Sequence, residues 1–158
     1  MKTVLLKQPG EIGISEIEKT SRRENEVLLK VRSTGICGSD IGAYKGVNPL
    51  VSYPRIIGHE IAGEVVEVAA DEKTFRVGDR VILEPYVYCG QCYPCSIGRT
   101  NCCENLTVRG VHIEGGMAEY VSHPRHLLHK IPEGIPWHLI PMAEPLVIAM
   151  HAVKQAEV

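Results

Sequence analysis

The sequence predicts a mainly β protein that folds as a compact barrel or sandwich, and three observations support this prediction. Apolar runs of strand length recur along the first two thirds of the 158 residues. Glycine and proline, as in Pro9-Gly10 and Gly115-Gly116, separate many of these runs. Hydrophobic residues make up 44% of the chain but aromatic residues only 5%, so the core must rest on valine, isoleucine and leucine. Short strands with this punctuation are typical of barrels and sandwiches.

Seven strands and two helices are expected in chain order. The strands fall at residues 3–7, 12–17, 27–33, 61–68, 80–83, 118–122 and 127–131. A short helix is expected over 39–44, beginning at Ser39 or Asp40. A longer helix is expected over 141–155, where Leu146, Met150 and Val153 recur with a spacing close to the helical period. Residues 48–55 and 86–107 are expected to form long loops, which in a small domain are usually functional or metal-bound.

Composition excludes several classes of function for this single-domain length. The 17 basic and 19 acidic residues give a net charge of −2, which provides no basic excess for binding nucleic acid. The apolar runs are too short to span a bilayer, and the first ten residues lack a secretory signal, so we expect a cytoplasmic protein. Because neither a Gly-x-Gly-x-x-Gly nor a Gly-Lys-Ser/Thr motif is present, no cofactor-binding residue is predicted.

Five of the six cysteines lie between residues 89 and 103. Cysteines that repeat two residues apart suit a metal ion better than a disulfide framework, which would distribute them along the chain. Cys89, Cys92, Cys95 and Cys103 offer four thiolates on one loop. Zinc takes four such ligands in a closed tetrahedral site, which organises the loop and leaves no open position for catalysis.

An iron–sulfur cluster is one alternative for these cysteines, because the first three also match the ferredoxin spacing C-x₂-C-x₂-C. The ferredoxin pattern continues with three residues and a Cys-Pro pair, and no Cys-Pro pair occurs in this chain. A small iron–sulfur electron carrier therefore stays open as an alternative function. A zinc-stabilised binding module without catalytic activity is the other alternative.

Cys37 and His59 have ordinary explanations when each is taken alone. A lone cysteine before glycine is usually a small buried residue, and a lone histidine is usually a core or surface residue. The remaining histidines fit no ligand spacing and are predicted to have no role in a site: His112, His123, His126, His129, His138 and His151.

Five segments, taken in order along the chain, resemble the catalytic domain of zinc-dependent medium-chain alcohol dehydrogenases. They are Gly35-Ile36-Cys37-Gly38-Ser39-Asp40, Gly58-His59-Glu60, Gly78-Asp79-Arg80-Val81, the cysteine group and Ala143-Glu144-Pro145-Leu146. Glu84-Pro85 is most similar to the branch of polyol, threonine and sugar-acid dehydrogenases, and residues 98–104 to bacterial galactonate-type members. The resemblance covers essentially the whole chain. It implies a GroES-like, partly open β-barrel with short helices and a zinc-binding loop lobe.

The resemblance also implies two zinc ions, one structural in the cysteine group and one catalytic. The catalytic ion would have three protein ligands and a fourth position for water or substrate. Cys37, His59 and Glu144 are the implied ligands, and Glu60 is a rival for the third place. Such an ion lowers the pKa of an alcohol, which then gives its hydride to NAD or NADP.

Two further roles follow from the resemblance. Ser39 resembles the hydroxyl that passes the alcohol proton outward, and Asp40 resembles the carboxylate that orients His59. Either residue can also cap the following helix. Many family members carry a histidine two residues after this aspartate, where this chain has Gly42, so the proton relay must end on Tyr44, a substrate hydroxyl or water.

The adjacent pair Cys102-Cys103 presents a choice, since only one of the two can complete a tetrahedron that already holds three cysteines. In the family, seven residues separate the third and fourth cysteines, and this spacing implies Cys103. Cys102 is then expected to be a spare, buried thiol.

The resemblance implies a longer enzyme. In the family a dinucleotide-binding Rossmann domain follows, so residues 1–158 are expected to be one GroES-like catalytic domain that is inactive by itself. The expected partner is a small-molecule alcohol, and the full-length enzyme is expected to form a homo-oligomer.

Overall fold

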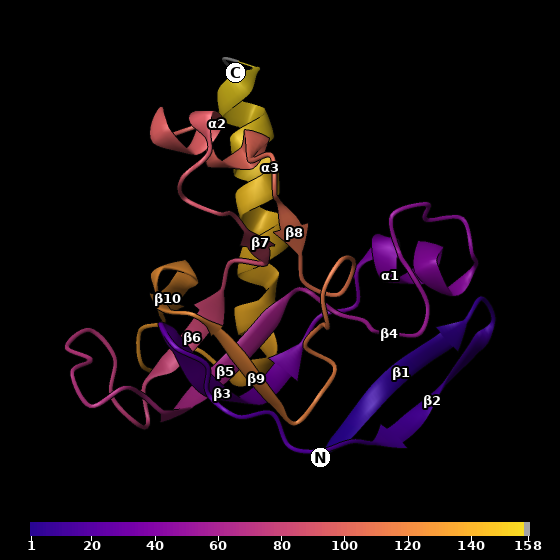
Figure 1. The fold of residues 1–158 in the computed structure, drawn as a ribbon, viewed down its shortest axis with the longest axis horizontal. Coiled ribbons are helices and arrows are strands. Elements are labelled where there is room, and N and C mark those ends of the chain that lie inside the picture. The colour runs from indigo at the N-terminus through magenta and orange to yellow at the C-terminus, as the bar shows by residue number, and fades with distance from the viewer. Residues whose placement is uncertain (157–158) are drawn as a thin grey trace.

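The computed structural model describes residues 1–156, and short antiparallel strands supply most of its regular structure (Figure 1). The strands are β1 (Lys2–Gln8), β2 (Glu11–Glu16), β3 (Glu26–Thr34), β4 (Arg55–Ile56), β5 (Ile61–Glu67), β6 (Arg80–Leu83), β7 (Tyr86–Val87), β8 (Thr107–Val108), β9 (Tyr120–Pro124) and β10 (Leu128–Lys130). The helices are α1 (Gly38–Tyr44), α2 (Tyr93–Ser96) and α3 (Ala143–Gln155), with 3₁₀ turns η1 (Thr100–Cys102), η2 (Arg125–Leu127) and η3 (Trp137–Met142). The predicted class, mainly β with short helices, is confirmed.

Two larger sheets and one small ribbon build the domain. The main sheet has the order β10-β6-β5-β3-β9, the second sheet has the order β2-β1-β4, and β7 pairs with β8. The two larger sheets join where Thr3 bridges to Ala118 and the Val4 N–H donates to the Met117 carbonyl over 2.7 Å. In Figure 1 the β7–β8 ribbon and α2 extend toward the top of the view, away from the second sheet.

The main core lies on one face of the central strands β3 and β5. Its buried members are aliphatic apart from one phenylalanine: Val27, Leu29, Ile61, Val65, Phe75, Val81, Leu83, Val121 and Leu128. Val27 and Leu29 share one face of β3 and belong to this core, while Leu28 between them is buried on the opposite face. The expectation that valine, isoleucine and leucine form the core is therefore met.

A second cluster anchors α1 to the segment before β5. It contains Leu6 of β1, Ala43 of α1 and Ile57, together with Val51 and Val111. The Tyr53 hydroxyl donates to the Ala43 carbonyl over 2.6 Å. Because α1 starts beside Cys37 and Ile57 precedes His59 by two residues, this cluster holds two candidate ligands in one frame.

Six predicted strands agree with the structure to within one residue at each end: β1, β2, β3, β5, β6 and β10. The strand predicted over 118–122 lies two residues later, at Tyr120–Pro124, because Ala118 instead bridges to the second sheet. The last predicted strand begins at Leu128, because residues 125–127 form the η2 turn. The two predicted long loops contain β4, β7, α2, η1 and part of β8.

The helices begin at other residues than predicted. Cys37, rather than Ser39 or Asp40, is the N-cap of α1, and Asp40 occupies the third helical position. The predicted helix over 141–155 is divided into the η3 turn and α3, and α3 buries none of its residues. Within residues 1–156, no helix combines the length and apolar character needed to cross a membrane.

Candidate metal centres

Cys37, His59 and Glu60 come together at one edge of the main sheet. The register between β3 and β5 ends with Thr34 opposite Ile61, and the Gly35 N–H donates to the Glu60 carbonyl over 2.8 Å. The residues that leave β3 and those that enter β5 therefore lie side by side. One ligand atom from each of the three side chains lies within 4.8 Å of the others.

The backbone before His59 is held by close packing against a second loop. The Gly116 N–H donates to the Gly58 carbonyl over 2.8 Å. Gly58 has a φ of 93°, in the region that favours glycine. A Cβ added at Gly115 would overlap the carbonyl groups of Ile57 and Gly58, so only glycine allows this approach. The direction from which His59 enters the site is thus set by backbone contacts.

The Asp40 carboxylate, which is buried, joins the two ligand-bearing segments. Oδ2 accepts from the Cys37 N–H over 2.9 Å, and Oδ1 accepts from the Gly58 N–H over 3.1 Å. Oδ1 also lies 3.8 Å from His59 Nδ1, which is beyond hydrogen-bond distance. His59 Nδ1 is buried without a hydrogen-bond partner. An imidazole between a carboxylate and a cysteine–glutamate pair has the surroundings typical of a metal-ligating histidine.

Glu60 is buried and packs directly against the backbone of Gly35. A Cβ added at Gly35 would overlap the Glu60 carboxylate. The family resemblance included Gly35 in the segment that contains Cys37 but implied no role for it. The thiol of Cys37 and the carboxylate of Glu60 lie beside His59, and this set of sulfur, oxygen and nitrogen donors suits a divalent cation such as zinc.

Glu144, predicted as the third ligand, lies outside the group of three. It stands in the first turn of α3. The pKa of its carboxyl is raised above the usual value, chiefly by burial, with a lowering contribution from His59 and a raising one from Glu60. Ser39 is half-buried in the first turn of α1, two residues after Cys37.

Tyr86, the first residue of β7, has a phenol whose pKa responds to the charges near the Cys37 group, and no role was predicted for it from the sequence. Burial raises the pKa of its phenol, and the charges of Glu144, Cys37 and Glu84 raise it further. The available signal was its position in the chain, directly after Glu84-Pro85.

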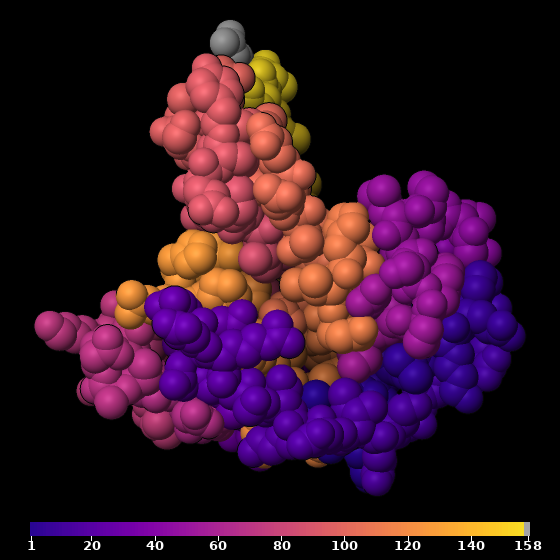
Figure 2. Space-filling model, viewed as in Figure 1, coloured from indigo at the N-terminus to yellow at the C-terminus, as the bar shows by residue number. Residues whose placement is uncertain are grey.

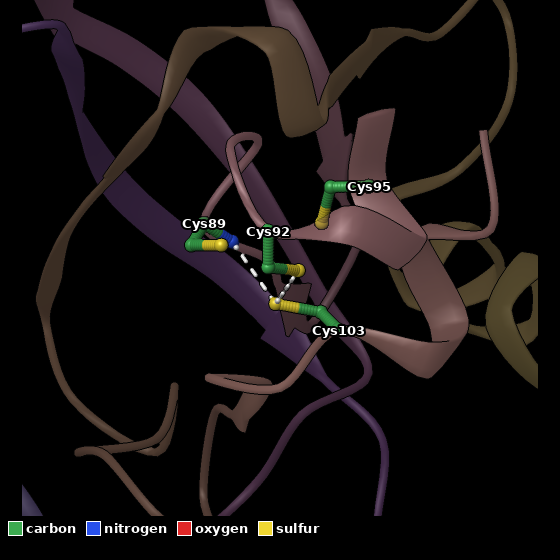
Figure 3. A group of neighbouring side chains, drawn as sticks. All are labelled: Cys89, Cys92, Cys95 and Cys103. Atoms are coloured by element: carbon green, nitrogen blue, oxygen red, sulfur yellow. Dashed lines mark hydrogen bonds between the residues drawn. The ribbon is translucent and has the colours of Figure 1, made fainter. Parts of the chain in front are cut away.

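Cys89, Cys92, Cys95 and Cys103 form the second group (Figure 3), and their sulfur atoms all lie within 4.8 Å of one another. The Sγ atoms of Cys92 and Cys103 are 3.9 Å apart. A tetrahedral zinc site with ~2.3 Å bonds requires sulfurs separated by about 3.8 Å. The residues present therefore fit a closed zinc site.

The surroundings of the four sulfurs give two of the thiols, those of Cys89 and Cys95, very different pKa values. Hydrogen bonding to the backbone of Gln91 and Cys92 lowers the pKa of Cys89 to about 6. Burial, with contributions from the neighbouring thiols, raises the pKa of Cys95 to about 12. The N–H groups of Cys89 and Asn105 both donate to Cys103 Sγ over 3.3 Å. A cation bound among these sulfurs would favour the thiolate form of all four.

Cys102 points away from this group. It is exposed, and the Asn101 side-chain amide donates to its sulfur over 3.4 Å. The expectation that Cys102 is buried is therefore wrong. The η1 turn places Cys102 on the outside, whereas Cys103 follows it in extended backbone and turns inward.

Comparison with known proteins agrees with this geometry. Residues 23–133 match the Alcohol dehydrogenase GroES-like domain family, so the fold and the site together define a GroES-like domain. The chain belongs to the zinc-dependent medium-chain alcohol dehydrogenase family, and the residues described here are its N-terminal domain. An iron–sulfur electron carrier is not favoured by this membership.

The relatives are dehydrogenases of about twice the length. An uncharacterized zinc-type alcohol dehydrogenase-like protein of Haemophilus influenzae is 58% identical over 156 residues, which cover 98% of this chain and 46% of that protein. L-galactonate-5-dehydrogenase of Escherichia coli is 42% identical over 159 residues, which cover 100% of this chain and 46% of that protein. The crystal structure of the Escherichia coli alcohol dehydrogenase rspB, complexed with NADH, superposes on this chain with a TM-score of 0.90 at 43% sequence identity. The superposition covers 99% of this chain and 46% of the rspB chain. The chain thus spans about half the length of the curated relatives it matches.

The contact between Gly35 and Glu60 gives a test of the first group. Gly35→Ala should reduce the free energy of unfolding by ~1–3 kcal/mol, the usual cost of forcing an extra methyl into a packed site. Glu60→Ala in the same background should recover most of this loss, because it removes the overlapping carboxylate. Urea denaturation of the single and double variants measures both effects.

Gly38→Ala is the matched control, because nothing lies within 4 Å of a Cβ added there. It should change the unfolding free energy little. Equal stabilities of the Gly35→Ala and Gly38→Ala variants would show that Glu60 does not pack against Gly35.

Proposed function

We propose that this chain is the catalytic domain of a zinc-dependent, NAD(P)-linked dehydrogenase that oxidises a secondary alcohol of a polyol, sugar acid or similar substrate. The convergence of Cys37, His59 and Glu60 beside a separate four-cysteine group is the observation that carries the proposal. The 42% identity to L-galactonate-5-dehydrogenase supports the substrate class. The NADH in the related rspB structure supports a nicotinamide cofactor.

The two metal groups are assigned different tasks. Cys37 and His59 would hold a catalytic zinc ion with Glu60 or Glu144 as third ligand, and the contact distances favour Glu60. The four-cysteine group would hold a structural zinc ion. When bound, the catalytic ion supplies a Lewis acid that polarises the alcohol oxygen and lowers the pKa of its hydroxyl.

The residues around the first group supply positioning and proton transfer. Asp40 holds the Cys37 and Gly58 backbones and presents its negative charge to His59, which favours one orientation of the ring. Ser39 offers a hydroxyl that can take the alcohol proton and pass it outward. Since Gly42 carries no side chain, the proton would leave through Tyr44, a substrate hydroxyl or water.

The hydride acceptor would be bound by residues outside this domain. The relatives are about twice as long, which leaves room for a dinucleotide-binding domain of the Rossmann type in the complete protein. From the family resemblance we also propose a cytoplasmic location and a homo-oligomeric state for the complete protein.

Metal content tests the assignment of two zinc ions. The purified domain should contain two zinc ions per chain by elemental analysis. Cys103→Ser should lose the structural ion and destabilise the cysteine lobe, because structural zinc supplies on the order of 10 kcal/mol of folding free energy in small zinc modules.

Cys102→Ser is the matched control for this experiment, because its sulfur is exposed and outside the group. It should retain both ions. One zinc ion in the unmodified chain, iron with labile sulfide, or loss of zinc from the Cys102→Ser variant alone would contradict the assignment.

Activity tests the proton path and the division between domains. Residues 1–158 alone should show no NAD(P)-linked alcohol oxidation, because hydride transfer requires a positioned nicotinamide. In the full-length protein, Ser39→Ala should lower kcat by ~10²–10⁴-fold with zinc content unchanged, since this is the usual contribution of a positioned proton-transfer group. Unchanged kcat in the Ser39→Ala variant would show that Ser39 does not transfer the alcohol proton. Turnover by residues 1–158 alone would refute the proposal that the nicotinamide is bound outside this domain.

A further inference from the structure

A hollow lies between the β2–β3 connection and the segment that follows β8, and none of the metal-group residues lines it. Its volume is about 630 Å³, within the ~300–1,000 Å³ range of small-molecule pockets. Figure 2 shows the hollow between the violet residues of the β2–β3 connection and the orange residues after β8. The proposed dehydrogenase function assigns no role to this hollow or to the charged residues that line it.

Basic side chains outnumber acidic ones around this hollow, which we call the arginine pocket. Four basic side chains line it: Lys19, Arg23, Arg55 and Arg109. Two carboxylates line it as well, those of Glu18 and Glu114. The pocket therefore carries a net positive charge in a chain whose net charge is −2.

Arg109, in the wall of the pocket, is a buried cation with neutral partners. Its Nε donates to His123 Nδ1 over 3.2 Å, Nη1 donates to the Glu114 carbonyl over 2.9 Å, and Nη2 donates to the Ser122 carbonyl over 2.7 Å. One N–H on each terminal nitrogen has no partner among residues 1–156. Burial lowers the pKa of Arg109 only to about 10, so the guanidinium is charged at neutral pH.

His123 does not compensate this charge. It is fully buried, and burial together with the Arg109 charge holds the pKa of its imidazole well below the usual value, so the ring is neutral. Because Arg109 Nε can only donate, His123 Nδ1 must accept, and the ring's Nε2–H donates to the Glu84 carbonyl over 2.9 Å.

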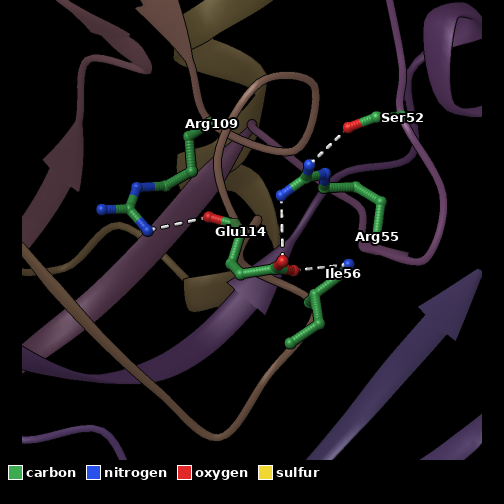
Figure 4. Close-up of polar contacts among 5 residues, drawn as sticks. All are labelled: Ser52, Arg55, Ile56, Arg109 and Glu114. Atoms are coloured by element: carbon green, nitrogen blue, oxygen red, sulfur yellow. Dashed lines mark hydrogen bonds and ion pairs between the residues drawn. The ribbon is translucent and has the colours of Figure 1, made fainter.

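The Glu114 carboxylate is already used by other groups (Figure 4). Arg55 Nη1 donates to its Oε1 over 2.9 Å, and the Ile56 N–H donates to its Oε2 over 2.7 Å. Only the Glu114 backbone carbonyl contacts Arg109, as Figure 4 also shows. Within the part of the chain that the structure describes, no carboxylate accepts a hydrogen bond from Arg109, although the charges of Glu26 and Glu114 raise its pKa and so balance its charge in part. The free N–H groups on its terminal nitrogens are therefore charged donors from which an anion in the pocket could accept.

The rim of the pocket adds two cations that can reach a ligand. Arg23 is exposed and lines the pocket. Lys19 crosses to β9, where its ammonium lies 4.0 Å from the centre of the Tyr120 ring. A ligand with two anionic groups could therefore contact Arg109 at one end and Arg23 or Lys19 at the other.

We propose that the arginine pocket binds a small organic anion through a carboxylate or phosphate group. The pocket is concave and of metabolite size, and its basic side chains come from three segments that fold together, which distinguishes it from a solvated surface of scattered charges. The site is independent of the alcohol-binding position proposed at Cys37 and His59.

Calorimetric titration of the zinc-loaded protein tests this proposal, with sodium succinate in one arm and inorganic phosphate in the other, at constant ionic strength. We expect saturable binding of one anion per chain in at least one arm. Binding of succinate alone would identify a carboxylate ligand, binding of phosphate alone a phosphate ester, and binding of both the shared anion chemistry. Arg23→Gln should weaken the binding by about fivefold, the effect of removing one partly exposed charge.

Two further variants control the experiment. Lys73→Gln removes an exposed charge outside the pocket and should leave the affinity unchanged. Arg109→Lys keeps the charge but removes the forked donor, so it should weaken binding in a protein whose fold is checked by circular dichroism. Binding that Arg23→Gln and Arg109→Lys leave unchanged would place the anion elsewhere, for example on the catalytic metal, and would overturn the proposal. Absence of saturable binding in both arms would overturn it as well.

Discussion

The antiparallel pairing of β3 with β5 is the interaction on which the rest of the domain depends. These strands lie in the middle of the main sheet and supply Val27, Leu29, Ile61 and Val65 to its core. The same register brings the end of β3 opposite the start of β5, so that Cys37 meets His59 and Glu60 just beyond the last pair. A shift of one residue would turn every side chain of a strand to the opposite face, so core burial and the metal group are specified by one register.

Close approach of backbones is the second constraint, and it explains why glycines surround the site. Gly35 leaves space for the Glu60 carboxylate, and Gly115 leaves space for the Ile57 and Gly58 carbonyls. Asp40 then joins the two ligand segments through two backbone N–H groups. Any side chain at these glycines would require the ligands to move apart.

The two metal groups differ in how they are assembled. All four cysteines of the second group come from one loop, so their meeting depends on local chain closure and on the metal itself. The first group needs the β3–β5 pairing and the anchoring of α1, so it can form only in the folded barrel. The buried pair Arg109–His123 connects distant parts of this barrel, since Arg109 lines the arginine pocket while His123 donates to the carbonyl of Glu84, two residues before Tyr86.

The sequence by itself determined the features that depend on local pattern: the mainly β class, six strands to within one residue, the four-cysteine motif and the family resemblance. Alternation and glycine punctuation act over a few residues, which is why they can be read directly from the chain. Only the tertiary structure decided that Glu60 joins Cys37 and His59 in one group that Glu144 does not join, and that Cys102 is exposed. It also gave His123, which fitted no ligand spacing, a buried structural contact with Arg109. These features depend on contacts between segments far apart in the chain, where burial and charge are set by neighbours that no local pattern specifies.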